Sequence, residues 1–405
     1  MVVPANYIQY PKPEFELAEV FRLFGDDYRR NHHLPRHHLK VMRDIVNCRT
    51  AALGGHVDEC SNCGALRLSY NSCRNRHCPK CQNSNRLLWV RARKAELLPI
   101  PYFHVVFTLP DPINSVAQFN QSLIYNLLFK AASETLLEFG QRHLGGEIGV
   151  TAVLHTWGQT LQQHLHLHCI VTGGALSPDR SQFRIGKNGF LFPTRALAEV
   201  FRGKFCDSLR KAFAAKQLLM PAQQPGLSPA PQFARWLGRL RKRKWVVYAK
   251  APFAGPEQVV AYLGRYTHRI ALANNRIVAV KDGQVSFRYK DYRNGGRIRI
   301  LELPAEEFIR RFLLHVLPED FVRIRHYGLL ANGRKKANLG VCRQLLVEPS
   351  QPPKTTEQAD QAIQPEDRRG EELCPSCGVG RMLRKWELAA GSDPPAFLQG
   401  LGVAA

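Results

Sequence analysis

Histidine and leucine alternate strictly in the segment LQQHLHLHCIVTGG, and this alternation constrains the local fold more than any other feature of the chain. A period of two residues is that of a β-strand, whose successive side chains point to opposite faces of a sheet. We therefore predict a strand that carries His164, His166 and His168 on one face. Three neighbouring imidazoles are typical of a metal site that coordinates their neutral nitrogens. The alternative is a row of solvent-facing histidines on an edge strand.

The charge of the chain favours a polyanionic partner. Its 57 Lys and Arg exceed its 33 Asp and Glu, so the formal net charge is +24 and the pI is about 9.9. Such an excess is typical of nucleic-acid-binding proteins, although ribosome-associated and membrane-surface proteins share it. No segment has the length and apolar character of a membrane span, and the first 25 residues lack an apolar signal core. We expect a cytoplasmic protein, and hence reduced cysteines.

Six of the eleven cysteines lie between positions 48 and 81, and four of them form two Cys-x-x-Cys pairs. Two such pairs can complete a tetrahedral site, so we expect one structural Zn²⁺ bound by Cys60, Cys63, Cys78 and Cys81. Four further residues surround the pairs and form either a second, interleaved site or a set of core thiols and surface histidines: Cys48, His56, Cys73 and His77.

The other five cysteines give weaker indications. Cys374 and Cys377 have the spacing of half a zinc site. Cys169, Cys206 and Cys342 have no partner at ligand spacing and are interpreted as buried apolar side chains.

Apolar periodicity and turn residues predict an α+β fold with an antiparallel sheet between about 100 and 345. Asp282-Gly283 predicts a hairpin, and Pro304 the start of a helix. Strands are expected at 102–110, 150–156 and 165–172, and helices at 16–30, 36–47, 84–97, 116–142, 194–215 and 256–269. The predicted segments are 1–47 (helical), 48–98 (zinc module), 100–345 (catalytic), 346–372 (disordered linker) and 373–405 (Cys-x-x-Cys tail).

Two tyrosines lie four residues apart in the sequence PEQVVAYLGRYTHR. On a helix, Tyr262 and Tyr266 would share one face. Arg265, His268 and Arg269 flank them, and the two arginines are candidates for phosphate binding. Such a pair is either packed in a core or available as nucleophiles that form phosphotyrosine esters.

The segment RWLGRLRKRKWVVYAK combines a basic run with aromatic residues. Basic side chains neutralise phosphates, and aromatic rings can stack on unpaired bases. We therefore expect DNA contacts from Arg241, Lys242, Arg243 and Lys244. The alternative is a solvated basic helix followed by a strand in which Trp236 and Trp245 are core residues.

Together these motifs resemble the two-tyrosine HUH rolling-circle transposases of the insertion-sequence ninety-one type, over about residues 20–345. The resemblance rests on the cysteine-rich module, on VVFTLPDPIN and HLHLHCIVTGG, and on YLGRYTHR followed by RFLLHVLPEDFVRIRHYG. It implies an HUH-type α+β domain preceded by a small helical zinc-binding domain.

The resemblance also implies roles for particular residues. The HUH histidines fall on His166 and His168, which would hold Mg²⁺ or Mn²⁺, and the nucleophiles on Tyr262 and Tyr266. The third metal ligand is left open among Gln163, His164 and His268. The implied activity is cleavage and rejoining of single-stranded DNA, at element ends and target, through 5′-phosphotyrosine intermediates; no oligomeric state is implied.

Three other functions stay open at this point. A plasmid replication initiator or relaxase would share the HUH chemistry. A zinc-dependent DNA-binding regulator, or a decayed transposase, would bind DNA without cleaving it. A histidine-triad nucleotide hydrolase would use the same His-Leu-His-Leu-His pattern but would form a phosphohistidine.

Overall fold

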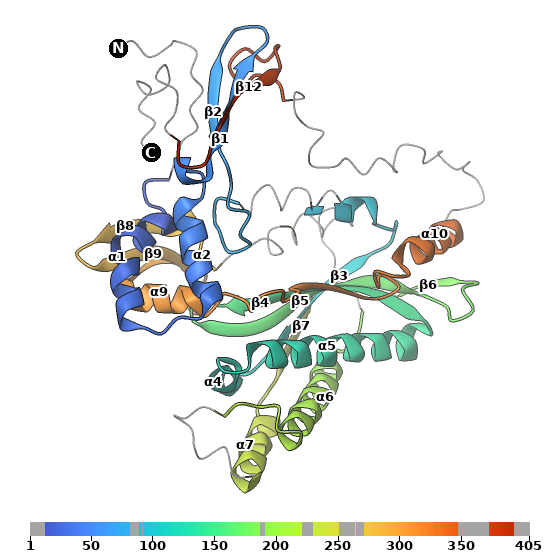
Figure 1. Ribbon diagram of the computed structural model, residues 1–405. Coiled ribbons are helices and arrows are strands. Elements are labelled where there is room, and N and C mark those ends of the chain that lie inside the picture. The colour runs from blue at the N-terminus through green and yellow to red at the C-terminus, as the bar shows by residue number, and fades with distance from the viewer. Residues whose placement is uncertain are drawn as a thin grey trace. The chain divides into compact units, whose positions relative to one another are not determined.

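A computed structural model describes residues 13–81, 89–90, 92–186, 191–220, 230–250, 264, 271–346 and 372–392. The chain divides into two compact units (Figure 1). Unit 1 comprises residues 1–85, 272–313 and 353–405, and unit 2 comprises residues 86–271 and 314–352. Each unit is therefore built from segments that are far apart in the sequence.

Unit 2 is built on a six-stranded sheet in which every pair of neighbouring strands is antiparallel. The strand order is β11-β4-β5-β3-β7, and β6 pairs with β5. The strands are β3 (Tyr102–Thr108), β4 (Glu147–Trp157), β5 (Gln163–Leu176), β6 (Phe183–Ile185), β7 (Val246–Lys250) and β11 (Ile324–Gly328). The α+β class and the strands expected near 102–110, 150–156 and 165–172 are confirmed.

Helices cover one face of this sheet (Figure 1). Phe107 of β3 and Leu167 of β5 belong to one buried cluster with Tyr125 and Phe201 from two helices. The rings of Phe107 and Phe201 are 4.9 Å apart in an edge-to-face contact, a favoured aromatic geometry. The described helices on this face are α4 (Asn114–Ala117), α5 (Gln121–Leu144), α6 (Thr194–Ala214) and α7 (Ala230–Lys242). Helix α10 (Lys335–Leu346) lies on the other face, where Leu339 packs with Ile170 of β5 (Figure 1).

The single helix predicted over 116–142 is interrupted near Asn120. The backbone of Asn120 is not helical (φ −134°, ψ 39°). Its side chain accepts a hydrogen bond from Leu219 N at 2.8 Å and donates one to Val116 O at 2.8 Å. Asparagine competes well for backbone hydrogen bonds and therefore favours such breaks.

Unit 1 contains α1 (Leu17–Asn31), α2 (Arg36–Asn47) and α9 (Ala305–Leu313). Phe21 of α1 contacts Phe312 of α9 edge to face, with ring centroids 5.6 Å apart. The predicted hairpin is confirmed, since Asp282 and Gly283 have φ of 51° and 73° in the turn between two strands. The sheet here has the order β10-β9-β8, formed by β8 (Ile277–Lys281), β9 (Gln284–Asp291) and β10 (Arg297–Pro304).

A second small sheet of unit 1 pairs strands from the N-terminal and C-terminal parts of the sequence. Its order is β12-β1-β2, from β1 (Gly55–Cys60), β2 (Leu66–Tyr70) and β12 (Met382–Leu388). Compact unit 1 therefore includes residues that the sequence interpretation assigned to two other segments, 100–345 and 373–405. Apolar periodicity predicts helices and strands but does not indicate which distant elements pack together, so it could not predict that these residues belong to unit 1.

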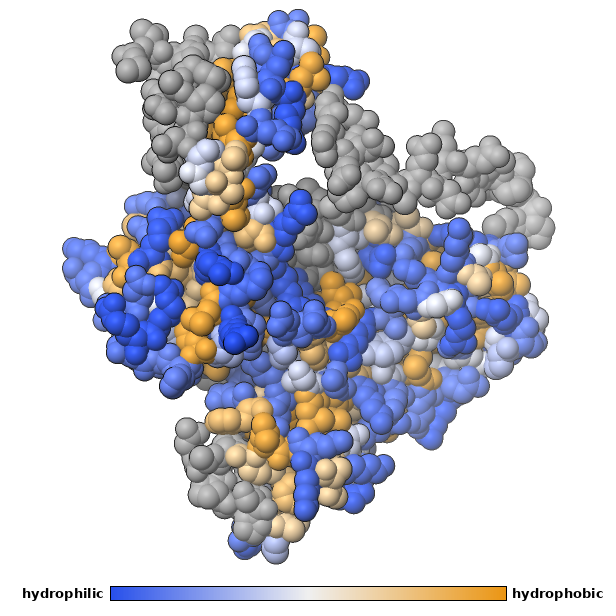
Figure 2. Space-filling view, in the orientation of Figure 1, coloured by the Kyte–Doolittle hydropathy of each residue, from blue (hydrophilic) through white to orange (hydrophobic). Residues whose placement is uncertain are grey.

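Three predicted features fall wholly or partly outside the described residues: the linker, the tyrosine helix at 256–269, and part of the helix at 84–97. Among the helices that the structure describes, none combines the length and the apolar character needed to cross a bilayer. The visible face over α1 and α2 is predominantly hydrophilic (Figure 2).

Candidate metal and nucleic-acid sites

The histidine pattern does form a strand, and one further histidine joins it. Odd-numbered residues of β5 such as Leu165 and Leu167 are fully buried in the helix-covered core. The ligand nitrogens of His166 and His168 lie within 4.8 Å of each other and of His155. His155 belongs to β4, where it is the direct cross-strand partner of His166. The three imidazoles form what we call the histidine group.

Hydrogen bonds orient two of these rings. His166 Nδ1 is 2.8 Å from the carbonyl oxygen of His164, so Nδ1 donates and Nε2 keeps its lone pair. His168 Nδ1 is 2.8 Å from Nε2 of His104, a buried histidine of β3. This contact leaves Nε2 of His168 for a ligand. A second hydrogen bond of this kind is the usual way in which proteins fix a metal-binding imidazole.

Burial favours the uncharged form of three imidazoles in or beside this group, those of His104, His164 and His166. It lowers the pKa of His166 to about 3, and it lowers the pKa of His104 to about 4. The pKa of His164 is also lowered by burial. Only the neutral imidazole has a lone pair for a metal ion, so these surroundings favour the ligand form at neutral pH.

Of the three residues left open as third ligand, the two that the structure describes lie outside the histidine group. Gln163 lies on the other face of β5, where its Oε1 is 3.4 Å from Gln118 Nε2. His164 shares the face, with its ring centroid 4.8 Å from that of His166, but its nitrogens lie outside the group. His268 is outside the described residues. The sequence reasoning missed His155, although pairing the two predicted strands as a hairpin would have brought it opposite the motif.

The candidate nucleophiles Tyr262 and Tyr266 also lie outside the described residues, as do Arg265 and Arg269. Their roles stay predictions.

The basic run is exposed, but the tryptophans beside it are not. Arg241, Lys242, Arg243 and Lys244 are all exposed, at the end of α7 and before β7. Trp236 and Trp245 are buried in the core, as the alternative interpretation of this segment proposed, and are not available to stack on bases.

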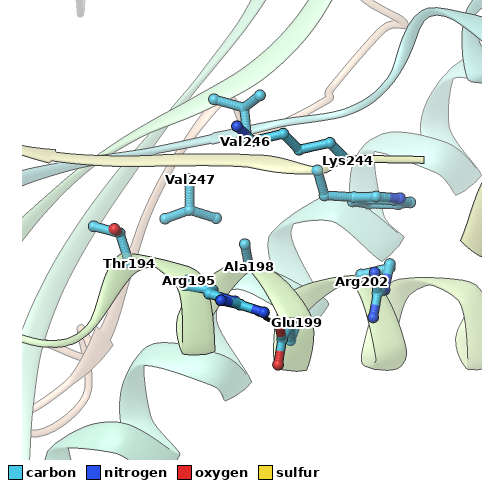
Figure 3. Close-up of a pocket in the computed structure, with 9 residues that line it drawn as sticks. Thr194, Arg195, Ala198, Glu199, Arg202, Lys244, Val246 and Val247 are labelled. Atoms are coloured by element: carbon cyan, nitrogen blue, oxygen red, sulfur yellow. Dashed lines mark hydrogen bonds and ion pairs between the residues drawn. The ribbon is translucent and has the colours of Figure 1, made fainter. Parts of the chain in front are cut away.

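A cavity of about 610 Å³ adjoins this run (Figure 3). Arg195 and Arg202 of α6 line it from one side and Lys244 from the other. Glu199 forms an ion pair with Arg195 at 3.3 Å. Since Lys244 both lines the cavity and belongs to the exposed run, the two form one continuous basic surface.

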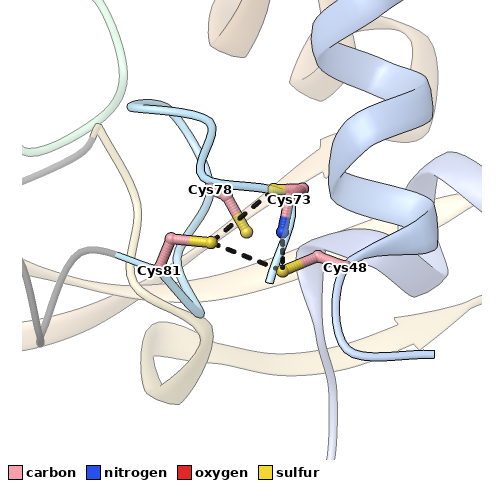
Figure 4. A group of neighbouring side chains, drawn as sticks. All are labelled: Cys48, Cys73, Cys78 and Cys81. Carbon is pink, nitrogen blue, oxygen red and sulfur yellow. Dashed lines mark hydrogen bonds between the residues drawn. The ribbon is translucent and has the colours of Figure 1, made fainter. Parts of the chain in front are cut away.

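Eight cysteines of unit 1 gather in two groups of four. In the first, the sulfurs of Cys48, Cys73, Cys78 and Cys81 converge (Figure 4). Cys81 Sγ is 3.5 Å from Cys48 Sγ and 3.6 Å from Cys73 Sγ. Hydrogen bonds from Cys73 and Cys78 lower the pKa of Cys48 to about 7. A bond with Cys48 lowers the pKa of Cys81 below its ordinary value, towards the thiolate that binds metal.

The second group combines the pair Cys60 and Cys63 with the pair Cys374 and Cys377. The expectation that Cys60, Cys63, Cys78 and Cys81 share one ion is therefore wrong. Cys78 and Cys81 are grouped with Cys48 and Cys73, and Cys60 and Cys63 with Cys374 and Cys377. The Cys-x-x-Cys spacing identifies each pair but does not indicate which other cysteines complete its site. Within the described residues neither group contains His56 or His77; His56 Nε2 is instead 3.5 Å from Asp58 Oδ2.

An antiparallel sheet with a histidine group on one face, together with cysteine groups in a separate unit, defines an α+β metal-binding protein. Comparison with known proteins narrows this class. Residues 20–109 match the family described as "Transposase zinc-binding domain", and residues 149–338 match the family described as "Putative transposase".

Two relatives agree with these matches. The chain is 50% identical over 374 residues to "Putative transposase y4qJ" of Sinorhizobium fredii, covering 91% of this chain and 94% of that one. It is 27% identical over 297 residues to the transposase for insertion sequence element IS801 of Pseudomonas savastanoi pv. phaseolicola, covering 73% and 70%. No solved structure matches. The chain belongs to the IS91 family of transposases with an N-terminal zinc-binding domain, as the motifs predicted.

Proposed function

We propose that this transposase cleaves and rejoins single-stranded DNA at the ends of a mobile element. The observation that carries the proposal is the histidine group, in which His155, His166 and His168 bring ligand nitrogens within 4.8 Å of one another on one sheet face. Three neighbouring imidazoles whose nitrogens converge in this way are typical of a site for a divalent cation.

These three residues would hold the cation, which supplies Lewis-acid polarisation of the scissile phosphate. An imidazole donor set suits transition-metal ions better than Mg²⁺, which prefers oxygen ligands. Of the two ions that the family resemblance implies, we therefore expect Mn²⁺ to bind more tightly. His104 would act as a positioning residue through its contact with His168 Nδ1.

The bond-making groups would be Tyr262 and Tyr266. A tyrosine oxygen forms a bond to phosphorus, the bond to the 3′ oxygen breaks, and the phenol proton passes to that leaving oxygen or to solvent. The DNA is then held as a 5′-phosphotyrosine ester, which conserves the energy of the phosphodiester. A free 3′-hydroxyl attacks this ester and releases the tyrosine. Two tyrosines would allow the donor and the target strand to be held at the same time.

The exposed run from Arg241 to Lys244 would bind the strand. Its charges neutralise phosphates without reading sequence, which suits a surface that carries single-stranded DNA past a reaction site. The adjoining cavity, lined by Arg195 and Arg202, offers further cationic groups at the same surface.

Incubation of the full chain with single-stranded oligonucleotides carrying the element ends tests the proposal. We expect a covalent protein–DNA adduct that requires Mn²⁺ or Mg²⁺ and withstands denaturation, with the nucleotide on a tyrosine. An adduct on a histidine would indicate a triad hydrolase instead. Retention of DNA with neither adduct nor cleavage, under either metal, would indicate a DNA-binding protein without this chemistry.

A further inference from the structure

The C-terminal Cys-x-x-Cys pair lies against the N-terminal one, although more than 300 residues separate them. Cys60 Sγ is 3.7 Å from Cys377 Sγ, and Cys63 Sγ is 3.8 Å from Cys374 Sγ. A tetrahedral site with Zn–S bonds of about 2.3 Å places its sulfurs about 3.8 Å apart. A disulfide would need about 2.05 Å, so the spacing is that of a metal site and not of a bridge.

The two pairs have the same local structure. Gly64 follows the first pair and Gly378 the second, with φ of 68° and 69°. Each glycine nitrogen donates to the carbonyl of the first cysteine of its pair, at 3.1 Å to Cys60 and 2.8 Å to Cys374. A left-handed residue is needed to close each turn, and glycine adopts it without a steric cost. Two matching knuckles that face each other are the arrangement of a zinc ribbon.

Backbone amides point at the sulfurs. Cys60 Sγ accepts from Asn62 N at 3.4 Å and from Cys63 N at 3.5 Å. Cys377 Sγ accepts from Gly380 N at 3.4 Å. Such bonds stabilise thiolates, the form that binds metal.

The strands beside the knuckles hold the pairs in register. In the antiparallel pairing of β1 with β12, Cys60 is opposite Met382. Gly380 passes so close to the first pair that a Cβ there would lie 2.5 Å from Cys60 Sγ and 2.8 Å from Asn62 N. Cys60 and Cys374 are buried together with Ala65 and Met382.

We propose that Cys60, Cys63, Cys374 and Cys377 form a second structural zinc site, a discontinuous zinc ribbon that the C-terminal segment completes. The first group, Cys48, Cys73, Cys78 and Cys81, binds its own ion within the N-terminal zinc-binding domain. The matched domain at residues 20–109 therefore supplies only half of the ligands of this second site. Zinc then joins residues that lie at opposite ends of the sequence.

Metal analysis of the purified full chain tests this inference without any DNA. We expect two Zn per chain in the wild type and one in the double variant Cys374→Ser, Cys377→Ser. The double variant Cys48→Ser, Cys73→Ser should also keep one, which shows that the sites are separate. Cys169→Ala with Cys342→Ala removes as many thiols outside both groups and should leave two. Two Zn in the Cys374→Ser, Cys377→Ser variant would overturn the proposal.

A second variant keeps the test decisive if the double serine variant aggregates. Histidine is a zinc ligand and serine is a poor one, so Cys377→His should retain the second ion under a chelator challenge that removes it from Cys377→Ser. Equal zinc content in these two variants would contradict the site. X-ray absorption of the wild type should find four sulfur neighbours at about 2.3 Å for both ions. Neither measurement depends on the proposed DNA cleavage, so the two proposals can fail separately.

Discussion

His155 on β4 lies directly across from His166 on β5, and their ring centroids are 5.3 Å apart in an edge-to-face arrangement. The ring of His155 also contacts that of His168, with 4.5 Å between centroids. One histidine from a neighbouring strand thus faces both histidines of the sequence motif. A motif on a single strand supplies ligands along one line, and a cross-strand residue is needed to surround an ion.

We predict that His155 is required for cleavage. Removing one of three protein ligands weakens the metal site, so His155→Ala should reduce adduct formation by on the order of 100-fold or more, as His166→Ala should. The matched control is His164→Ala, on the same face but outside the histidine group, and its effect should be milder. The yield of covalent adduct at a fixed Mn²⁺ concentration is measured for the three variants. Full activity of His155→Ala would leave the histidine group without a third protein ligand.

Much of the fold could be predicted from local patterns. The alternation of His and Leu predicted β5, and Asp282-Gly283 predicted the hairpin of β8 and β9. Both features depend only on residues that are neighbours in the sequence. The pairing of distant segments could not be predicted in this way. Cys63 lies beside Cys374, which is more than 300 residues away in the sequence. The spacing of the two nearer Cys-x-x-Cys pairs instead predicted, wrongly, that Cys60 and Cys63 share an ion with Cys78 and Cys81.

The candidate site could be predicted only in part, because local patterns indicate some of its residues and the pairing of separate strands brings in the others. His166 and His168 carry a signal in the motif itself, whereas His155 carries one only after two strands are aligned. Burial of Trp245 illustrates the other limit. Its surroundings of Phe201 and Phe205 come from α6, and nothing in the basic run indicates them. Composition predicts a basic surface, but tertiary packing decides which aromatic rings reach it.

A second prediction concerns acid stability. Buried His315 is 2.9 Å from Leu161 O through Nε2 and 3.2 Å from Thr156 Oγ1 through Nδ1, which fits a neutral ring that donates and accepts. Burial lowers its pKa to about 4 from an ordinary 6.5. Between these values the unfolded chain binds a proton that the folded chain does not. The free energy of unfolding should therefore fall as the pH drops from 6.5 to 4, by on the order of 3 kcal/mol from this residue.

Urea denaturation at pH 7.5 and pH 5 measures this effect, with tryptophan fluorescence as the signal because the ring of Trp157 is 6.1 Å from that of His315. His315→Gln should be less stable at pH 7.5 and should lose less stability on acidification than the wild type. The exposed His143→Gln is the control and should follow the wild type at both pH values. An unchanged pH dependence in His315→Gln would mean that other groups govern acid unfolding.

A third prediction concerns the basic run. Each phosphate contact on a single strand contributes about 0.7 to the slope of log K against log salt concentration. Alanine at Arg241, Lys242, Arg243 and Lys244 should therefore weaken binding of single-stranded DNA at low salt and reduce that slope by up to about 3. The same loss is expected for unrelated sequences, because phosphate contacts carry no sequence information.

The control for this variant is Arg210→Ala with Lys211→Ala. These side chains each form a 2.8 Å ion pair with Asp207, so part of their charge is already compensated. Binding measured by fluorescence anisotropy over a series of salt concentrations should show a smaller change than in the basic-run variant. If the two variants behave alike, the strand follows another surface.

The last prediction separates the two tyrosines from each other and from a packing role. Phenylalanine keeps the ring but lacks the hydroxyl, so Tyr→Phe removes the nucleophile at little cost in folding. The variant Tyr262→Phe, Tyr266→Phe should form no covalent adduct with single-stranded DNA. Each single variant should retain some cleavage, whereas strand transfer should need both tyrosines, because donor and target must each be held by an ester. Tyr248→Phe, at an exposed position of β7, is the matched control and should keep the wild-type adduct yield. Peptide mapping should find the nucleotide on Tyr262 or Tyr266, and undiminished adduct formation by the double variant would exclude these tyrosines as the nucleophiles.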